Sequence, residues 1–400
     1  MFFMRRFIRI TDAVLAAICA VLMTFVAVGD VTMPDELVRY DGAGERLSAV
    51  YSCTAQSPQT VNRPDGAAGE ETLRFLKLVP VKQVKVTAKP SGTVYVSGEV
   101  FGIKLYTDGV MVVGTQRIDL GDGEDADPAV EAGIRPGDIV TEIDGNPVCS
   151  AEEVIAVLNE NNGQTYSLRV KRDGRYKTFS LTPVYSPREG CYKAGMWVRD
   201  STAGIGTITF YNAANGSFAA LGHPINDVDT NELMPLLKGE AVKAEVINVQ
   251  RAGTGSTGSL WCDFKADAIG ELTENSAIGL YGTYQTLPEV AQAVPVAARQ
   301  EVQKGSAQIL ATVEGTEPQL YNVEITKISY NNEQEQKDIV FKVTDKALLE
   351  KTGGIVQGMS GSPMLQNGKL VGAVTHVIVN RPEKGYAVFA ETMYEESAGF

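Results

Sequence analysis

The spacing of apolar positions divides the chain into an apolar helix, a module that mixes strands with a helix, and a long region of short strands. The helix comes first, where residues 13–28 form an apolar run that follows Arg5, Arg6 and Arg9. As a helix this run would be about 24 Å long, a length between the apolar core of a signal peptide and a full membrane span. We therefore interpret residues 1–30 as a targeting segment, either a cleaved signal or an uncleaved anchor.

The next part of the chain, residues 31–90, is polar. Gln, Ser, Thr, Asn, Pro and Gly concentrate at 54–69, a composition typical of a linker or a weakly ordered region. Only the last third, residues 73–89, has the alternating valines that predict one or two strands.

Residues 91–185 have the pattern of a compact module. Two apolar runs precede the string AGIRPGDIVTEIDG at 132–145. A short helix is expected next, because Ser150 and Glu153 have the spacing of a capping box and an apolar face follows them. An Asp-Gly turn between two alternating runs then predicts a closing hairpin.

This order of elements resembles a PDZ domain of the bacterial type, and the string at 132–145 is the most specific part of the resemblance. PDZ domains bind a peptide as an added strand at a sheet edge. The resemblance implies that the peptide contacts one glycine-containing run: Phe101, Gly102, Ile103, Lys104 and Leu105. An acidic insert at 121–127 departs from the usual pattern, in a place where it could reshape or cover the groove.

Residues 186–400 contain many short β-prone runs separated by glycine turns. This pattern predicts a β-barrel or sandwich domain. The string GTGSTG at 253–258 has the glycine spacing of a dinucleotide-binding loop, but residues 259–264 have the pattern of a strand where such a loop needs a helix. We interpret the string as a mobile hairpin loop.

Composition excludes several classes of function. A chain of 400 residues suggests two or three domains, and its net charge of −13 argues against a general nucleic-acid binder, which carries a basic footprint. The five cysteines lack Cys-x-x-Cys spacing, so neither a zinc site nor a disulfide scaffold is expected. No cofactor or metal is predicted. Because the early arginines precede the apolar run, the rest of the chain is expected outside the cytoplasm.

One serine stands at the centre of a glycine-flanked turn, in the string GMSGSP at 358–363. The glycines allow unusual backbone dihedral angles, which can display Ser360 as a nucleophile. They also allow the amides of Gly358 and Ser360 to converge as a two-donor oxyanion hole. An ordinary polar turn has the same composition, so this motif needs support from elsewhere in the chain.

The only two histidines of the chain both lie in the third region. His223 ends an apolar run before a polar loop, where an exposed imidazole can meet a nucleophile. With a reference pKa of about 6.5, it can accept a serine proton near pH 7. His376 lies within the alternating run 371–379 and is interpreted as a half-buried strand histidine.

A histidine base needs a carboxylate that holds its tautomer. Asp227 and Asp229 follow His223 closely, but side chains so near usually cap the same loop. Asp345 ends a predicted strand before the serine turn and is slightly favoured, because it can approach from another part of the fold. A metal site at His223, Asp227 and Asp229 is the remaining alternative, although the chain has no His-x-x-x-His spacing.

Two long strings carry a second resemblance. GIGTITFYNAANGSFAALGHPINDVDT occupies 204–230, and GGIVQGMSGSPMLQNGKLVGAVTHVIVNRPEKGYAVF occupies 353–389. Together with the apolar N-terminus and the PDZ-like module, they resemble the serine peptidases of the stage IV sporulation protein B family. The resemblance implies a chymotrypsin-like double β-barrel for the third region, with Ser360 as nucleophile, His223 as general base and Asp345 as orienting acid.

The same resemblance implies a place of action. In that family the peptidase is secreted from the forespore into the space between the two spore membranes, where it cuts itself. It then cleaves the regulator of an intramembrane protease, which processes a precursor sigma factor in the mother cell. Expected partners are therefore that regulator, a second copy of the chain, and the membrane through the N-terminal segment, with no nucleic acid. Residues 31–90 match the family least.

We therefore expect a mainly β, membrane-targeted, self-cleaving serine endopeptidase whose PDZ module governs self-association or substrate presentation. Two alternatives stay open. A general extracytoplasmic quality-control peptidase would degrade unfolded substrates broadly. A catalytically silent PDZ scaffold would keep normal signalling in a Ser360→Ala protein.

Overall fold

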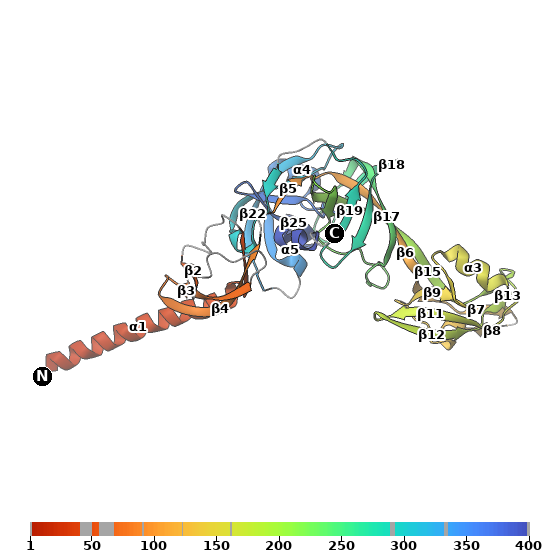
Figure 1. The fold of residues 1–400 in the computed structure, drawn as a ribbon, viewed down its shortest axis with the longest axis horizontal. Coiled ribbons are helices and arrows are strands. Elements are labelled where there is room, and N and C mark those ends of the chain that lie inside the picture. Colours follow the sequence, from red (N-terminus) through yellow and green to blue (C-terminus); the bar gives the residue numbers. More distant parts are fainter. Residues whose placement is uncertain are drawn as a thin grey trace.

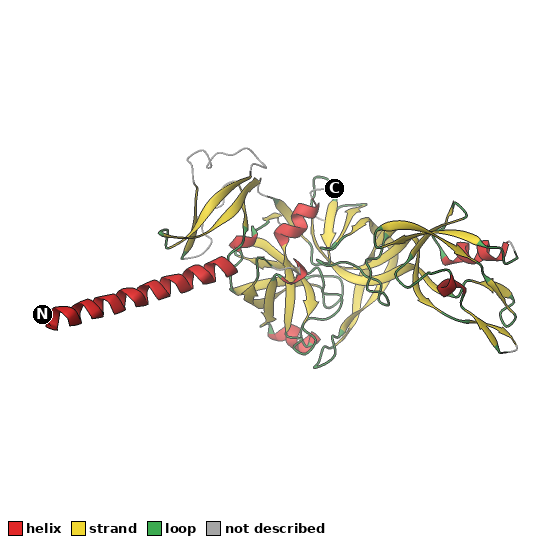
Figure 2. Cartoon of the chain, turned by 90° about the horizontal axis from the view of Figure 1, so that it is seen from below, coloured by secondary structure: helices red, strands yellow, loops and turns green. Residues whose placement is uncertain are grey.

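The computed structural model describes residues 2–40, 50–55, 68–89, 92–121, 123–160, 162–288, 293–331 and 335–397. Figure 1 shows an extended N-terminal helix, a small sheet beside it, a central body of strands, and a second module at the end far from the helix. Strands dominate the cartoon in Figure 2, which confirms the predicted mainly β fold.

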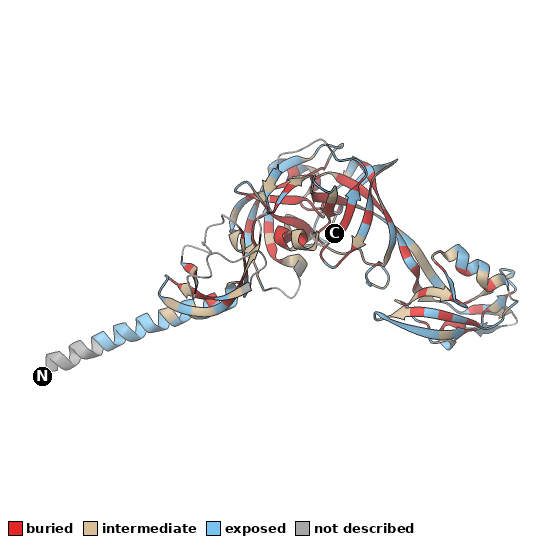
Figure 3. Cartoon of the chain, in the orientation of Figure 1, coloured by how far each residue is buried: buried red, intermediate tan, exposed pale blue. Residues whose placement is uncertain are grey.

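Helix α1 (Phe2–Thr32) contains the predicted apolar run. Residues 11–32 of this helix are long and apolar enough to cross a membrane, and most of their side chains are exposed (Figure 3). Exposed apolar surface of this extent is typical of a segment that contacts lipid. A signal sequence and a membrane anchor both have this character.

A four-stranded sheet follows α1 in the order β1-β4-β3-β2, with β1 parallel to β4. The predicted valine alternation explains how this sheet packs, since Val84 and Val86 are buried against Leu73 and Phe75. Part of the region interpreted as a linker therefore forms a packed sheet, while most of its polar centre at 54–69 lies outside the described residues. The strands are β1 (Glu36–Tyr40), β2 (Tyr51–Ala55), β3 (Ala68–Phe75) and β4 (Val79–Lys89).

Six strands form a first barrel, because β6 pairs with β15 and closes the run β6-β17-β18-β19-β16-β15 into a ring. Phe101, Leu105 and Phe218 are buried in its core. The predicted hairpin loop at 253–258 joins β17 to β18. The strands of this sheet are β5 (Thr93–Val96), β6 (Val100–Thr115), β15 (Met196–Tyr211), β16 (Ser217–Ala220), β17 (Leu236–Gln250), β18 (Ser259–Asn275), β19 (Leu280–Tyr284) and β20 (Ala293–Pro295).

A second closed barrel has the order β21-β22-β23-β26-β25-β24. One apolar cluster joins the two barrels, since Val246 and Leu260 of the first pack with Ile309 and Phe341 of the second. The double β-barrel implied by the resemblance is therefore present. The second barrel and the helices around it comprise η2 (Arg299–Glu301), β21 (Gly305–Ala311), β22 (Gln319–Ile328), η3 (Glu335–Lys337), β23 (Ile339–Val343), α4 (Lys346–Thr352), β24 (Pro363–Gln366), β25 (Lys369–Val377), β26 (Lys384–Phe389) and α5 (Ala390–Ser397).

The distal module has the predicted helix and hairpin. The amide of Glu153 donates to the Ser150 hydroxyl at 3.2 Å, and the Ser150 amide donates to the Glu153 carboxylate at 3.2 Å, so the capping box is formed. Asp173 and Gly174 have φ of 52° and 72°, as a tight hairpin turn requires. The elements are β7 (Ile118–Gly121), β8 (Glu124–Ala126), α2 (Pro128–Glu131), β9 (Ile139–Ile143), β10 (Asn146–Pro147), α3 (Ala151–Glu160), β11 (Tyr166–Arg172), β12 (Arg175–Leu181), β13 (Val184–Ser186) and β14 (Cys191–Lys193).

The module is inserted between two strands of the first barrel, which corrects the start predicted at residue 91. The first part of strand β6 pairs with β15 and β17 in the barrel. Further along, at Val110 and Met111, β6 pairs with β9 of the module.

The peptide-binding edge predicted for the module is also wrong. Its five residues pair on both sides, as Phe101 does with Gly206 and Lys243. A strand with two hydrogen-bonded neighbours has no free edge to accept a peptide. The five residues so placed are Phe101, Gly102, Ile103, Lys104 and Leu105.

Candidate active site

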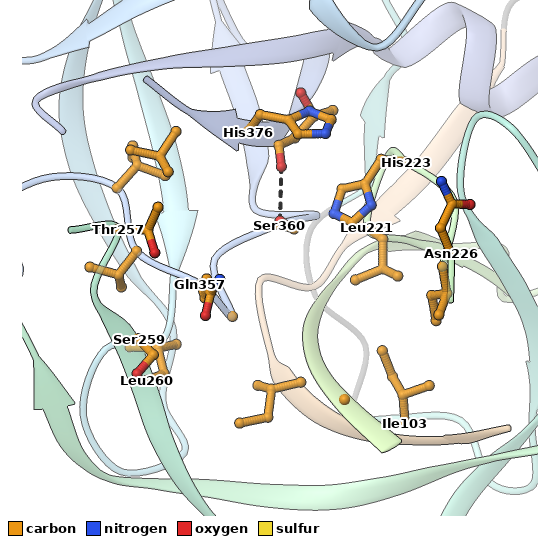
Figure 4. Close-up of a pocket in the computed structure, with 18 of the residues that line it drawn as sticks. Ile103, Leu221, His223, Asn226, Thr257, Ser259, Leu260, Gln357, Ser360 and His376 are labelled. Atoms are coloured by element: carbon orange, nitrogen blue, oxygen red, sulfur yellow. Dashed lines mark hydrogen bonds between the residues drawn. The ribbon is translucent and has the colours of Figure 1, made fainter. Parts of the chain in front are cut away.

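A cavity of about 790 Å³ is lined by residues of both barrels (Figure 4). The first barrel contributes β15, the loop that follows β16, and the β17–β18 hairpin, and the second contributes the serine turn and the end of β25. Ser360, His223 and His376 all line this cavity. The structure thus brings together two of the three residues predicted for catalysis and one that was interpreted as structural.

The serine turn is held by strand β15 of the first barrel. Thr207 donates from its amide to the Ser360 carbonyl at 2.8 Å and from its hydroxyl to the Gly358 carbonyl at 2.8 Å. The Thr209 hydroxyl donates to the Gly361 carbonyl at 2.7 Å. Gly361 has a φ of 95°, and a Cβ there would lie 1.9 Å from the Thr207 carbonyl oxygen, so only glycine allows this approach.

These anchors occupy the carbonyl groups of the turn and leave amide groups open. Within the described residues, neither the Gly358 amide nor the Ser360 amide donates a hydrogen bond. Gly358 has a φ of 100°, a region that favours glycine. Two unengaged amides two residues apart, one of them on the serine itself, are the arrangement of a two-donor oxyanion hole.

The Ser360 hydroxyl donates to the Thr375 carbonyl at 2.9 Å. It therefore does not donate to His223 in this conformation. A rotation of the Ser360 side chain away from Thr375 is needed before the hydroxyl can pass its proton to an imidazole.

His223 stands in the loop after β16, where Leu221 and Gly222 have φ of 68° and 72°. Its Nδ1 lies 2.8 Å from the Pro224 carbonyl oxygen. A carbonyl oxygen only accepts, so Nδ1 carries the proton and Nε2 is left as the acceptor. Burial lowers the pKa of His223, and the Pro224 hydrogen bond opposes this shift. Figure 4 shows the His223 ring beside Ser360, as a general base requires.

His376 lies closer to this chemistry than its sequence pattern indicated. Its ring centroid is 5.0 Å from that of His223, with 41° between the ring planes. Its Nδ1 is buried and has no hydrogen-bond partner among the described residues. Burial, followed by repulsion from His223 and Lys337, lowers the pKa of His376 to about 4. His376 is therefore a neutral imidazole at neutral pH.

His376 is a half-buried residue of β25, as its pattern indicated, and a register shift explains how it also reaches the cavity. Strict alternation would have turned one side of β25 to the core and the other to solvent. The pairing of β25 with β26 shifts between Val374 and His376, and such a bulge re-aims the following side chain. A bulge at this position has no clear signal in a single sequence.

The favoured acid, Asp345, and the two alternatives, Asp227 and Asp229, all have partners outside the cavity. Asp345 caps α4, where its Oδ1 accepts from the amides of Ala347 at 3.0 Å and Leu348 at 3.2 Å, while its Oδ2 accepts from Asn322 at 3.2 Å. It does not line the cavity.

Asp227 caps its own loop, as its position in the sequence indicated. Its Oδ1 accepts from the amides of Asp229 at 3.0 Å and Thr230 at 2.9 Å, and its Oδ2 pairs with Arg199, which also pairs with Asp229. No residue that lines the cavity, among those the structure describes, is an aspartate or a glutamate. The described part of the chain also contains no group of three or more His, Cys, Asp or Glu side chains placed to hold a metal ion.

Comparison with known proteins agrees with this architecture. The model of the SpoIVB peptidase S55 family matches residues 190–394. The chain belongs to this family. Its members are serine peptidases, and the match covers the second barrel and the strands of the first barrel from β15 to β19. A PDZ domain model matches residues 106–182, beginning where β6 leaves the first barrel.

Two curated relatives match a short part of the chain. The magnetosome formation proteases MamE of Magnetospirillum gryphiswaldense and Paramagnetospirillum magneticum are each 44% identical over 55 residues, which is 14% of this chain. The chain spans 7% and 8% of the length of those two relatives. A solved PDZ domain of an SdrC-like protein from Listeria monocytogenes is 25% identical and covers 23% of this chain and 87% of its own, with a TM-score of 0.19.

Proposed function

We propose that this chain is an extracytoplasmic serine endopeptidase, with Ser360 as nucleophile and His223 as general base. The observation that carries the proposal is the convergence of these two side chains in one cavity beside two unengaged amides, those of Gly358 and Ser360. Membership of the SpoIVB peptidase S55 family supports the reaction class.

The proposed reaction has two stages. Ser360 Oγ attacks the carbonyl carbon of a peptide while His223 Nε2 takes its proton, and the amides of Gly358 and Ser360 stabilise the oxyanion. The imidazolium returns the proton to the departing amine as the C–N bond breaks. Water, deprotonated by His223, then hydrolyses the ester on Ser360 and releases the second product.

The Pro224 carbonyl gives His223 part of what a carboxylate gives in other serine peptidases. It keeps the proton on Nδ1, so Nε2 is the nitrogen left free to accept the proton of Ser360 once that side chain turns toward His223. The acid role that the resemblance implies for Asp345 stays a prediction. In this structure the Asp345 side chain caps α4.

The apolar wall of the cavity favours a substrate with an apolar side chain. Leu260, Phe264, Ile355 and Val356 line it together with Ile103. A peptide with an apolar side chain at the scissile position would bury that side chain there, and each buried CH₂ group contributes about 0.8 kcal/mol.

For the biological role, we propose self-cleavage followed by cleavage of the regulator of an intramembrane protease, so that a precursor sigma factor is processed in the mother cell. Family membership and the apolar helix α1 support this role, because both fit a peptidase held at a membrane between two cells. The PDZ module would present the substrate or a second copy of the chain.

The test uses the full chain and the Ser360→Ala variant. We expect loss of both self-cleavage and cleavage in trans, and retained proteolysis by the variant would contradict the proposal. Broad digestion of unfolded proteins would instead indicate a quality-control peptidase. Normal sporulation signalling by Ser360→Ala would indicate a PDZ scaffold.

A further inference from the structure

The loop between β16 and β17 runs from the active-site cavity to the PDZ module. Asn226 and Val228 of this loop line the cavity, and we call these two residues the loop wall. We propose that Arg199 is a positioning residue, which holds Asp227 against the PDZ module and so fixes the loop wall for a peptide substrate. This inference rests on the proposed function, because the loop wall would contact the peptide that the enzyme cleaves.

Three consecutive residues of the loop have alternate surroundings. Asn226 and Val228 reach the cavity, whereas the side chain of Asp227 between them is completely buried. Successive side chains of an extended segment point to opposite sides. Asp227 therefore anchors the back of a segment whose front meets the substrate. Figure 4 shows Asn226 on the same side of the cavity as His223.

Arg199 binds two acids of this loop. Its Nη1 donates to Asp227 Oδ2, and its Nη2 donates to Asp229 Oδ2 at 2.7 Å. Burial raises the pKa of Asp227, but hydrogen bonds from Thr230 and from Arg199 outweigh burial, so the pKa is lowered. The Asp227 carboxylate therefore stays charged. A planar guanidinium that spans two carboxylates fixes both their spacing and their direction. We call this arrangement the loop clamp.

The other end of the loop clamp belongs to the PDZ module. Arg199 pairs in β15 with Met111 of β6, and Met111 also pairs with Ile139 of β9 in the module. The loop reaches the same place directly, since the Thr230 hydroxyl donates to the Met111 sulfur at 3.7 Å. A displacement of the module would therefore move the loop wall through Arg199 and Thr230.

The loop clamp also joins two sides of the cavity. Residues 202–205 of β15 line the cavity, three positions beyond Arg199 in the same strand. Arg199 thus holds the loop wall at a set distance from the strand that forms another side. A cleft that binds an extended peptide depends on this distance, because a misplacement of about 1 Å can cost up to ~10²-fold in rate.

Val228 is suited to contact a substrate. Its side chain is 85% exposed although it follows a buried aspartate. An apolar side chain at the edge of a cavity gains free energy when a ligand covers it. A peptide bound in the cavity would remove Val228 from water.

The experiment uses the full chain in detergent micelles and two probes. An alkyl fluorophosphonate reports the reactivity of Ser360, and a peptidyl phosphonate with leucine at the reacting position also requires the sides of the cavity. For each probe the maximal rate of labelling is separated from the apparent affinity, and thermal melting is recorded for every form. The forms compared are wild type, Ser360→Ala, Arg199→Ala, Arg199→Lys, Val228→Ser and Arg172→Ala.

Arg172→Ala is the matched control. Arg172 pairs with Asp138, whose side chain is as completely buried as that of Asp227. This pair lies within the module, and neither of its residues lines the cavity. Both arginine-to-alanine changes leave a buried carboxylate without its cation, so both should lower the melting temperature. Only the loss of Arg199 should change the affinity for the peptidyl phosphonate.

We expect Arg199→Ala to weaken the apparent affinity for the peptidyl phosphonate by about tenfold, within the loss that a misplaced contact can cause. The maximal rate with the alkyl fluorophosphonate should stay within about threefold of wild type, because a change in binding alone leaves the maximal rate intact. Arg199→Lys keeps a cation beside Asp227 but cannot span two carboxylates, so its affinity should be intermediate. Val228→Ser should weaken the same affinity without a lower melting temperature.

Four results would overturn the inference. Wild-type affinity in Arg199→Ala would reject the loop clamp, and if that variant does not fold, wild-type affinity in Arg199→Lys would reject it. Wild-type affinity in Val228→Ser would remove the contact with the peptide. An equal loss of affinity in Arg172→Ala would show that affinity follows the stability of the module. A wild type that neither probe labels would remove the proposed function as well, whereas labelling lost in Ser360→Ala and unchanged in both Arg199 variants would keep the function and reject the loop clamp.

Discussion

The hydroxyl of Ser360 is bound to the carbonyl of Thr375 at 2.9 Å, on the opposite barrel from His223. The nucleophile and its proposed base therefore share a cavity without sharing a hydrogen bond. Catalysis requires the hydroxyl to exchange one partner for the other. Because Thr375 precedes His376 in β25, the same strand that holds the nucleophile in this conformation also contacts the base.

The first prediction concerns the anchor of the oxyanion amides. Thr207→Val removes the hydroxyl that holds the Gly358 carbonyl, and this buried carbonyl then lacks a partner, at a cost of about 1–3 kcal/mol. We expect a lower free energy of unfolding together with fluorophosphonate labelling slowed by about tenfold, because the Gly358 amide loses its fixed position.

Thr209→Val is the matched control for that change. Thr209 is equally buried, and its hydroxyl holds Gly361, whose amide is not part of the proposed oxyanion hole. It should lose similar stability and keep its labelling rate within about threefold of wild type. Equal slowing in both variants would show that the rate follows stability and not the Gly358 amide.

Gly361 should not tolerate a side chain. In Gly361→Ala the new Cβ would lie 1.9 Å from the Thr207 carbonyl oxygen at a φ of 95°. We expect a loss of more than about 3 kcal/mol in stability, because backbone strain and a clash between the barrels combine. Gly368→Ala has a φ of 77° with open space around the Cβ, and should cost only about 1–2 kcal/mol. Chemical denaturation measures both, and similar losses would contradict the tight approach of the turn to β15.

The coupling of the two histidines can be measured in the inactive Ser360→Ala protein. The pKa of His376 should be about 4, because burial and then repulsion from His223 and Lys337 lower it. His223→Gln removes one repelling charge and should raise this pKa. Lys337→Gln should also raise it, as an independent control. NMR titration of the imidazole protons resolves the effect, and a His376 pKa unchanged by His223→Gln would show that the rings are not neighbours.

The same shift makes stability depend on pH. In the unfolded chain His376 takes up a proton near its ordinary pKa of about 6.5, whereas in the folded chain it does so only near pH 4. The unfolded state therefore binds more protons between these values, and the free energy of unfolding falls as the pH falls through this window. His376→Gln should fall less steeply there, and parallel curves for the two proteins would contradict the depressed pKa.

Much of the site was predictable because its signals are local. The glycines around Ser360 and the position of His223 after an apolar run both lie within a few residues of the side chain concerned. The short β-prone runs likewise predicted a β-barrel or sandwich, whereas the double barrel and the PDZ module were implied by resemblance to known families. These features depend on backbone conformations that nearby residues determine.

The failures concern relationships between distant segments. Phe101, Gly102 and their neighbours have the composition of a peptide-binding edge, yet β15 and β17, each more than 90 residues later, occupy both sides of that strand. His376 is the half-buried strand histidine that its pattern indicated, but the bulge in the pairing of β25 with β26 that brings it to the cavity has no local signal. Asp345 caps α4 in this structure, a contact that its position before Ser360 did not indicate, and its role as orienting acid stays a prediction. The alternation and spacing of residues along one sequence do not determine which distant strands pair with each other.

The central claim, that Ser360 and His223 form a working nucleophile and base, is tested most directly by fluorophosphonate labelling of the full chain. The probe is applied to wild type, Ser360→Ala and His223→Ala, and intact mass is recorded over time. We predict labelling that requires both residues, with N-terminal truncation accumulating only in the wild type. Labelling that persists in either variant, or a wild type that stays unlabelled with a constant mass, would contradict the account.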